Sequence, residues 1–284
     1  MYLITRARAR ARTAGAPLPT VFRTLASAGV HFRRGQLALV AAAPGGGKSA
    51  LASTVLLKSG VDGLYFSADS DEAEQYSRSV SILTGRPLTE VQEAMERDDT
   101  EEFDDELTAL SRLRFDFNSS ISLHDIENTV TAYAHLYGRY PTAIVVDNLR
   151  DVTSDEISEG YLVQDNILAY LKDLARHTRA CVIVLAHVTG EYENGDSPIP
   201  LGGLRGKIGK IPQLVLTLYR EENLLGSEDM GVAIVKNRGG RASSAGRYTV
   251  ALDCDLSTMT IKDHETTPVT EGGDGYRRLY EEQM

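Results

Sequence analysis

The sequence predicts an α/β fold: a mostly parallel, twisted sheet with helices on both faces and antiparallel strands added at its C-terminal edge. Three observations lead to this prediction. Short apolar runs alternate with helix-like segments along most of the 284 residues, as in a parallel sheet covered on both faces. A glycine-rich turn follows the first of these runs. The last three apolar runs follow one another without helices between them, which indicates the antiparallel extension.

The individual elements follow from local patterns. Residues 36–42 form a continuous apolar run, which is typical of a strand buried on both faces. Strands are expected over residues 36–42, 63–68, 113–117, 143–147, 180–186, 214–219, 231–236, 248–253 and 259–262. Helices are expected over residues 48–58, from the second strand to about residue 83, in the acidic region 90–106, and over residues 122–137 and 160–177. Ser122 and Asp125 have the spacing of a capping pair, so a helix should begin there.

Segments of biased composition flank the predicted domain, which we expect to span residues 21–263. Residues 1–20 alternate arginine with small residues and close with two prolines, which predicts a flexible arm. This arm is either a disordered tail or a segment that packs on a neighbouring subunit or contacts nucleic acid. Residues 264–284 are polar and contain glycine, which predicts a second tail.

Composition excludes several classes of protein. The two cysteines cannot build a disulfide framework or a zinc site, and the six histidines lack metal-ligand spacing. The apolar runs are too short to cross a bilayer, and the N-terminal arginines are not followed by the apolar segment of a secretory signal. We therefore expect a cytoplasmic protein with no membrane partner.

Charge is unevenly distributed along the chain. The net charge of −10 argues against nucleic-acid binding, because phosphate contacts need Lys and Arg. Much of the acidic excess lies in residues 90–106, however, whereas residues 202–241 are rich in cations. These cations are Arg205, Lys207, Lys210, Arg220, Lys236, Arg238 and Arg241. A locally basic surface can therefore coexist with an acidic whole.

The glycine-rich turn fits a phosphate-binding loop, except that Ala42 takes the place of the usual first glycine. Glycines let backbone N–H groups converge on phosphate oxygens, and the following helix adds its positive N-terminal dipole. Lys48 would reach the β- and γ-phosphates of ATP, and the Ser49 hydroxyl would coordinate Mg²⁺. The residues expected to bind the nucleotide are Ala43, Pro44, Gly45, Gly46, Gly47, Lys48, Ser49 and Ala50.

Two further carboxylates are expected at the same edge of the sheet. Asp147 ends the apolar run AIVVD and is the candidate for holding Mg²⁺ with Ser49. Asp69 follows the second strand and is the candidate for orienting or deprotonating the attacking water. Asp71 and Glu72 compete for that role, and any of the three could instead begin the next helix.

These segments, in this order, resemble the RecA-like ATPase core of DnaB-type replicative helicases. The resemblance covers about residues 20–262 and rests on AAAPGGGKS, LYFSADS, AIVVDNL and VLAHVTG. It implies a RecA-like P-loop NTPase fold and a catalytic role for Asp69, although the family commonly has Glu at that position. It also implies that His187 takes the place of a polar γ-phosphate sensor, which is usually Gln.

The later segments resemble parts of the family that act outside a single subunit. LGGLRGKIGKIPQLVLTLYRE includes a loop whose counterpart contacts DNA, which implies contacts from Arg205, Lys207 and Lys210. VAIVKNRGGRAS is similar to the segment that supplies a Lys/Arg pair to the neighbouring subunit's nucleotide, which implies that role for Lys236 and Arg238. Residues two apart on a strand point to the same side. The resemblance therefore implies a homo-oligomer, a ring of six.

We expect an ATP-hydrolysing, ring-forming motor on single-stranded DNA, a DnaB-like helicase. Only the short arm precedes the core, as in compact phage- or plasmid-type forms. A RecA-like recombinase or recombination mediator is the first alternative. An ATP-binding regulatory or assembly protein with weak hydrolysis is the second, and the departures at Asp69 and His187 keep it open.

Overall fold

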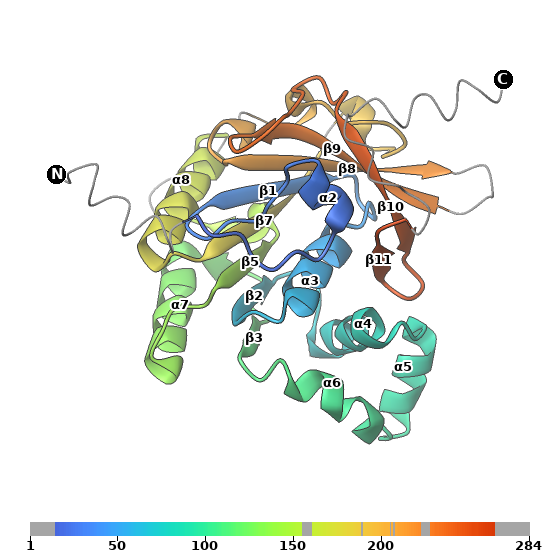
Figure 1. Cartoon of the computed structure of the whole chain (residues 1–284). Coiled ribbons are helices and arrows are strands. Elements are labelled where there is room, and N and C mark those ends of the chain that lie inside the picture. The colour runs from blue at the N-terminus through green and yellow to red at the C-terminus, as the bar shows by residue number, and fades with distance from the viewer. Residues whose placement is uncertain are drawn as a thin grey trace.

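A sheet of nine strands forms the centre of the protein (Figure 1). The structure is a computed structural model, and it describes residues 15–154, 161–188, 190–204, 206, 208–222 and 228–264. The strands are β1 (Leu37–Ala42), β2 (Gly63–Ser67), β3 (Leu113–Asp116), β5 (Ala143–Asp147), β7 (Cys181–His187), β8 (Leu214–Glu222), β9 (Glu228–Asn237), β10 (Thr249–Asp255) and β11 (Thr260–Lys262). Their order in the sheet is β11-β10-β9-β8-β1-β7-β5-β2-β3.

Strand direction divides the sheet into two parts. The six strands from β3 to β8 in this order are parallel. From β8 outward, β9, β10 and β11 pair in antiparallel fashion. The predicted α/β fold with an antiparallel C-terminal extension is therefore confirmed.

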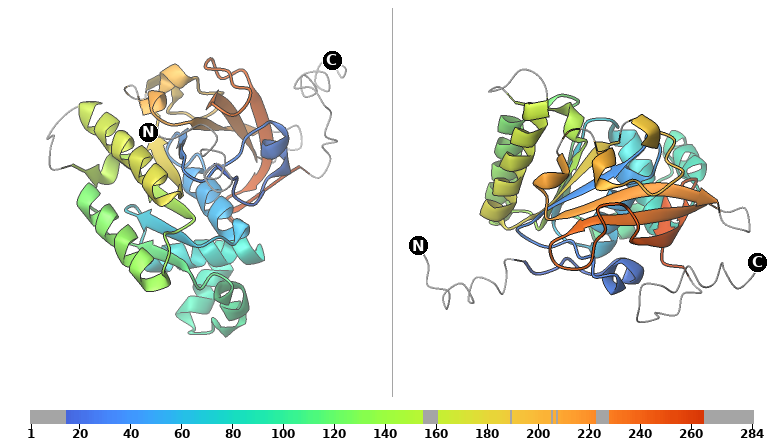
Figure 2. Two further views of the ribbon diagram at one scale, coloured as in Figure 1. Left: turned by 60° about the vertical axis from the view of Figure 1, so that its left-hand side comes forward. Right: turned by 90° about the horizontal axis from the view of Figure 1, so that it is seen from above.

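Helices cover both faces of the sheet (Figures 1 and 2). They are α2 (Arg23–Ser27), α3 (Lys48–Ser59), α4 (Glu72–Thr84), α5 (Leu88–Glu96), α6 (Asp104–Thr108), α7 (Leu123–Tyr137) and α8 (Tyr161–Thr178). Alternate residues of β1 face opposite ways: Val40 packs in the core beneath α3, and Leu39 packs in the core beneath α7 and α8. This is why the first strand is apolar throughout.

Short elements complete the fold. A small parallel sheet joins β4 (Ile121–Ser122) to β6 (Val152–Thr153). The 3₁₀ helices are η1 (Glu101–Phe103), η2 (Leu149–Asp151), η3 (Gly190–Tyr192), η4 (Leu201–Gly203) and η5 (Ile208–Lys210). The predicted capping pair is confirmed, because Ser122 accepts from the Asp125 amide at 3.1 Å and Asp125 accepts from the Ser122 amide at 2.9 Å. None of the helices in the described ranges combines the length and apolarity that a bilayer crossing requires.

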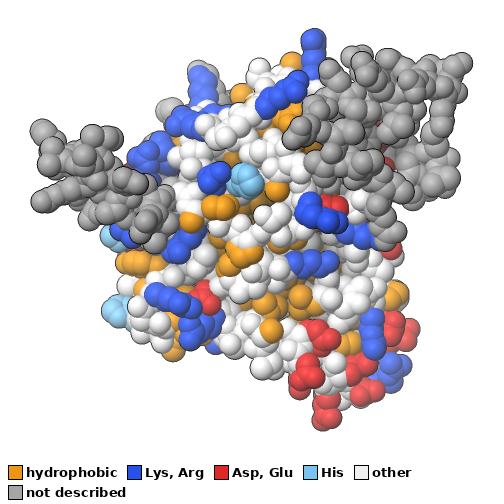
Figure 3. Space-filling model, viewed as in Figure 1, with side chains coloured by type: hydrophobic (Ala, Val, Ile, Leu, Met, Phe, Trp, Pro, Cys, Tyr) orange, Lys and Arg blue, Asp and Glu red, His pale blue; other side chains and the backbone are white. Residues whose placement is uncertain are grey.

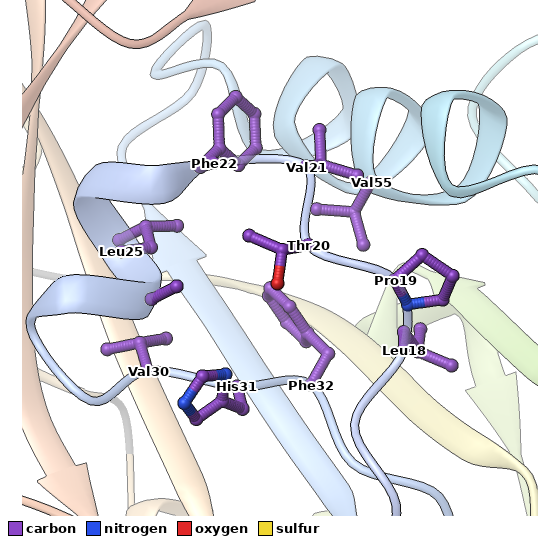
Figure 4. A pocket seen from close by; sticks show the side chains of 11 residues that line it. Leu18, Pro19, Thr20, Val21, Phe22, Leu25, Val30, His31, Phe32 and Val55 are labelled. Carbon is purple, nitrogen blue, oxygen red and sulfur yellow. The ribbon is translucent and has the colours of Figure 1, made fainter.

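Residues 15–20, which we assigned to the arm, pack on the domain. The Leu18 amide donates to the Phe32 carbonyl at 2.7 Å, and the Leu18 side chain is buried. Figure 4 shows Leu18, Phe22 and Phe32 around a small pocket that Val55 of α3 also lines. Residues 1–14 of the predicted arm and residues 265–284 of the predicted tail lie outside the described residues.

Negative charge is concentrated at one end of the molecule. Figure 3 shows a cluster of acidic side chains over the region of α5 and α6. Most acids of residues 90–106 are exposed, and a small satellite core of Val80, Val91, Ala94 and Phe103 supports them. The acidic net charge therefore says little about the rest of the surface.

Candidate nucleotide-binding and catalytic site

The phosphate-binding loop connects β1 to α3 at the carboxyl edge of the parallel strands. Gly45 and Gly47 have positive φ angles of 69° and 83°, and Gly47 is the N-cap of α3. The Gly46 amide donates to the Ala43 carbonyl at 3.0 Å, which closes the turn. The first amides of α3 therefore face the loop, and a helix N-terminus of this kind attracts phosphate.

Gly47 is required by its surroundings as well as by its backbone. A Cβ atom at Gly47 would lie 2.3 Å from Cε of Met230, a residue of β9 that is 1% exposed. Since Met230 is enclosed, its methyl group cannot move into open space. The loop and the start of β9 are therefore in close contact.

Replacing Gly47 by alanine should lower both stability and nucleotide affinity. We expect a loss of unfolding free energy about 1–3 kcal/mol larger than for Gly60→Ala, and an affinity at least about tenfold weaker. Gly60 is the matched control, because it ends the same helix with a φ of 62° and nothing within 4 Å of its Cβ position. Denaturant unfolding and binding of a fluorescent ATP analogue measure the two effects. Equal losses for the two variants would contradict the close contact with Met230.

Lys48 lies at the base of the loop and is 7% exposed. Its Nζ is 3.1 Å from the Ala43 carbonyl and 3.4 Å from the Ala42 carbonyl, so the loop's own backbone holds the amine. Burial lowers the pKa of Lys48, and the nearby Asp147 and Asp69 oppose that shift. The amine is thus in electrostatic contact with both predicted carboxylates.

Asp147 ends β5 and is 5% exposed, beside Ser49. It accepts hydrogen bonds from the Ser49 hydroxyl and, at 2.8 Å, from the Tyr65 hydroxyl. Burial raises the pKa of Asp147, and these two hydrogen bonds oppose the shift. A carboxylate next to a hydroxyl is a set of hard oxygen donors, which fits Mg²⁺.

Asp69 follows β2 and is exposed, next to the end of β5. Its Oδ2 accepts a hydrogen bond of 2.7 Å from the Asn148 side-chain amide. Asp71, which competed with Asp69 in the sequence, is the N-cap of α4 and accepts from the Glu74 amide at 2.8 Å. Glu72 is the first residue of that helix.

His187 ends β7 and pairs with Ala42 of β1. Its Nδ1 is 3.4 Å from Nζ of Lys48. Burial lowers the pKa of His187, and the positive Lys48 lowers it further, so the imidazole is neutral at pH 7. Because Lys48 can only donate, Nδ1 is the acceptor and Nε2 carries the proton. A neutral side chain with one N–H donor can report on a phosphate oxygen as an amide would.

The structure adds residues that the sequence reasoning missed. Tyr65 of β2 holds Asp147, and Asn148 holds Asp69. Arg220, at the end of β8, donates to the Gly45 carbonyl at 2.7 Å. One signal could have identified Arg220, because its strand lies beside the strand that enters the phosphate loop.

Lys236 and Arg238 lie at the opposite edge of the sheet from the phosphate loop. Lys236 of β9 pairs with Val215, near the start of β8, whereas Leu218, further along β8, pairs with Ala42 at the loop. Lys236 donates to the carbonyls of Gly209 and Lys210 at 2.8 and 2.6 Å. Burial and the neighbouring Arg238 lower the pKa of Lys236. Neither side chain reaches the loop of its own chain.

The predicted DNA-contacting residues are only partly described. Arg205 and Lys207 lie outside the described residues. Lys210 is exposed at the end of η5, next to the backbone that Lys236 binds.

Comparisons with known proteins identify related chains. The model of the family "DnaB-like helicase C terminal domain" matches residues 17–251. The Gene 65 protein of Mycobacterium phage L5 is 43% identical over 254 residues, which are 88% of this chain and 94% of the relative. The Gene 65 protein of Mycobacterium phage D29 is 43% identical over 232 residues, which are 81% of this chain and 100% of the relative.

Solved structures share the fold at low sequence identity. A structure of a DnaB-like replicative helicase and its interactions with primase has a TM-score of 0.76 at 18% identity. The alignment covers 92% of this chain and 65% of that protein. A second solved structure, of an isolated ATPase domain, has a TM-score of 0.74 at 18% identity, with 92% of this chain and 96% of that domain covered.

Proposed function

Because the chain belongs to the family of DnaB-like helicase C-terminal domains, we propose that it is a ring-forming, ATP-hydrolysing motor that moves on single-stranded DNA. Family membership establishes an ATPase of the DnaB-like helicase type. The observation that carries the finer proposal is the division of the site. Lys48, Asp147, Asp69 and His187 meet at one edge of the sheet, and Lys236 and Arg238 lie at the other.

Within one subunit, the side chains at the loop have complementary tasks. Lys48 and the α3 amides bind the phosphates, and Ser49 with Asp147 would hold Mg²⁺, which neutralises charge on the phosphate oxygens. Asp69 lies on the neighbouring strand end, where it can orient the attacking water and accept its proton. His187 offers a neutral donor beside Lys48 for sensing the γ-phosphate.

The cations at the opposite edge need a second subunit. Arg238 is exposed, and guanidinium groups stabilise the charge that develops on a transferred phosphoryl group. A head-to-tail arrangement of subunits would bring Arg238 of one chain to the phosphate loop of the next. Arrangements of that kind close into rings, and we propose a ring of six.

The loop around η4 and η5 is the proposed DNA contact. Lys210 is exposed there, and Arg205 and Lys207 belong to the same segment. Local positive charge that follows a phosphate backbone is enough for single-stranded DNA, so the acidic patch over α5 and α6 does not oppose binding.

The proposal predicts that single-stranded DNA stimulates ATP hydrolysis by about tenfold or more, because DNA binding at the loop orders the neighbouring subunits. Steady-state phosphate release with and without a poly-dT oligonucleotide measures this. Strand displacement on a forked duplex then separates a helicase from a recombinase. Tight nucleotide binding with background hydrolysis in both conditions would contradict the motor and favour a regulatory ATP-binding protein.

A further inference from the structure

Asp69 stands just beyond the sheet on a short side chain. The Ala68 amide donates to the Asp147 carbonyl at 2.9 Å, which is the last backbone bond between β2 and β5. Asp69 follows directly and is exposed. An exposed aspartate has several rotamers, so a separate contact is needed to keep its carboxylate in one place.

Asn148 supplies that contact from the neighbouring strand end. It is 3% exposed, and its Oδ1 accepts from the Arg150 amide at 2.9 Å. Because Oδ1 is bound to an N–H donor, the orientation of the amide is fixed and Nδ2 faces the other way. Nδ2 donates to Oδ2 of Asp69 at 2.7 Å, which leaves Oδ1 of Asp69 for another partner.

We propose that Asn148 is a positioning residue for hydrolysis, which holds one oxygen of Asp69 so that the other faces the attacking water. The proposal rests on the proposed function. A fixed carboxylate offsets the short reach of an aspartate, since catalysis depends strongly on the placement of the base.

The charges around this pair favour a neutral partner. Asp147 is buried next to Asn148 in the chain, and Asp151 lies close enough for Asp69 to raise its pKa. A further carboxylate at position 148 would repel Asp69, whereas an amide provides a donor without charge. Lys48 and Arg150 are cations that face the same space.

One substitution separates positioning of Asp69 from closure of the local turn. Asn148→Asp keeps an acceptor for the Arg150 amide but removes the donor to Asp69. The matched control is Asn118→Asp, because Asn118 accepts from the Ser120 amide at 3.2 Å in the same pattern, on an exposed turn after β3. Both variants add one negative charge beyond a strand end.

We expect Asn148→Asp to lower kcat by about 10- to 100-fold, which is a part of the 10²–10⁴-fold effect of a general base. The KM for ATP should change by less than about twofold, since Asn148 is not assigned a role in binding ATP. Asn118→Asp should stay within about twofold of the wild type in both constants.

A double-variant cycle tests whether Asn148 acts through Asp69. In an Asp69→Asn background, Asn148→Asp should lower single-turnover hydrolysis no further, because the group that it positions is gone. Binding of a non-hydrolysable ATP analogue reports folding. Asn148→Ala enters the same cycle if the aspartate variant does not bind it.

Two results would overturn the proposal: an unchanged kcat for Asn148→Asp, or an equal loss with and without Asp69. Wild-type protein that hydrolyses no ATP would instead sink the proposed function itself, and the positioning role with it.

Discussion

Lys48→Ala is expected to reduce ATP hydrolysis by about a thousandfold, while the protein stays folded. The removed amine is the buried cation at the base of the loop, within electrostatic reach of Asp147 and Asp69. Removing one preorganised charge from a transition state typically costs about 10²–10³ in rate, and a desolvated ammonium lies at the upper end. Initial rates of phosphate release at saturating ATP measure the effect.

Lys58→Ala is the matched control for Lys48→Ala. Lys58 lies in the last turn of the same helix, α3, and is exposed. Its loss should leave hydrolysis within about twofold of the wild type. If Lys48→Ala kept more than about a tenth of the wild-type rate, the assignment of residues 42–49 as the phosphate loop would be wrong.

Arg238→Ala should also lower hydrolysis by about a thousandfold, the smallest effect typical of an arginine supplied to a phosphoryl group. Unlike Lys48→Ala, it should leave nucleotide binding by the isolated subunit unchanged, because Arg238 lies at the far edge of the sheet from its own loop. Hydrolysis rates and the affinity for a fluorescent ATP analogue separate these two effects. Arg247→Ala, which removes another exposed arginine, should change neither.

Mixing the two inactive variants tests whether Arg238 acts on a neighbour. A ring that contains both has some interfaces with an intact loop from the Arg238→Ala subunit and an intact arginine from the Lys48→Ala subunit. The mixture should therefore hydrolyse ATP faster than either variant alone. Lys48→Ala mixed with the double variant has no intact loop and should stay inactive. No recovery in the first mixture, under conditions where subunits exchange, would contradict a shared site.

Local sequence patterns were sufficient for the fold because each strand has an apolar signal of its own. The run AIVVD became β5 with the predicted bounds, and the alternation of both cores along β1 explains its uniform composition. Boundaries failed where pairing continues through polar residues. We predicted that the strand from Leu214 ends at residue 219, but β8 extends to Glu222, because backbone pairing with β9 does not depend on apolar side chains.

The site was only partly predictable for a related reason. The loop and the strand-end acids have motifs in one stretch of chain, so Lys48, Asp69 and Asp147 could be named. Asn148 and Arg220 act on residues that are 79 and 175 positions away. Contacts of that separation follow from strand order and register, which no local pattern contains. The predicted contacts of Arg205 and Lys207 remain predictions.

Strand β9 touches the nucleotide site of its own chain at one end and prepares the arginine for the next site at the other. Met230 packs against Gly47, and Lys236 anchors η5 just before Arg238. From Met230 to Lys236 the strand spans about 20 Å, at about 3.4 Å per residue. Because β8 and β10 flank it on both sides, β9 behaves as a stiff rod. A ring joined by such rods would pass each opening or closing of a loop to the adjacent site, so its subunits would fire in sequence and not independently.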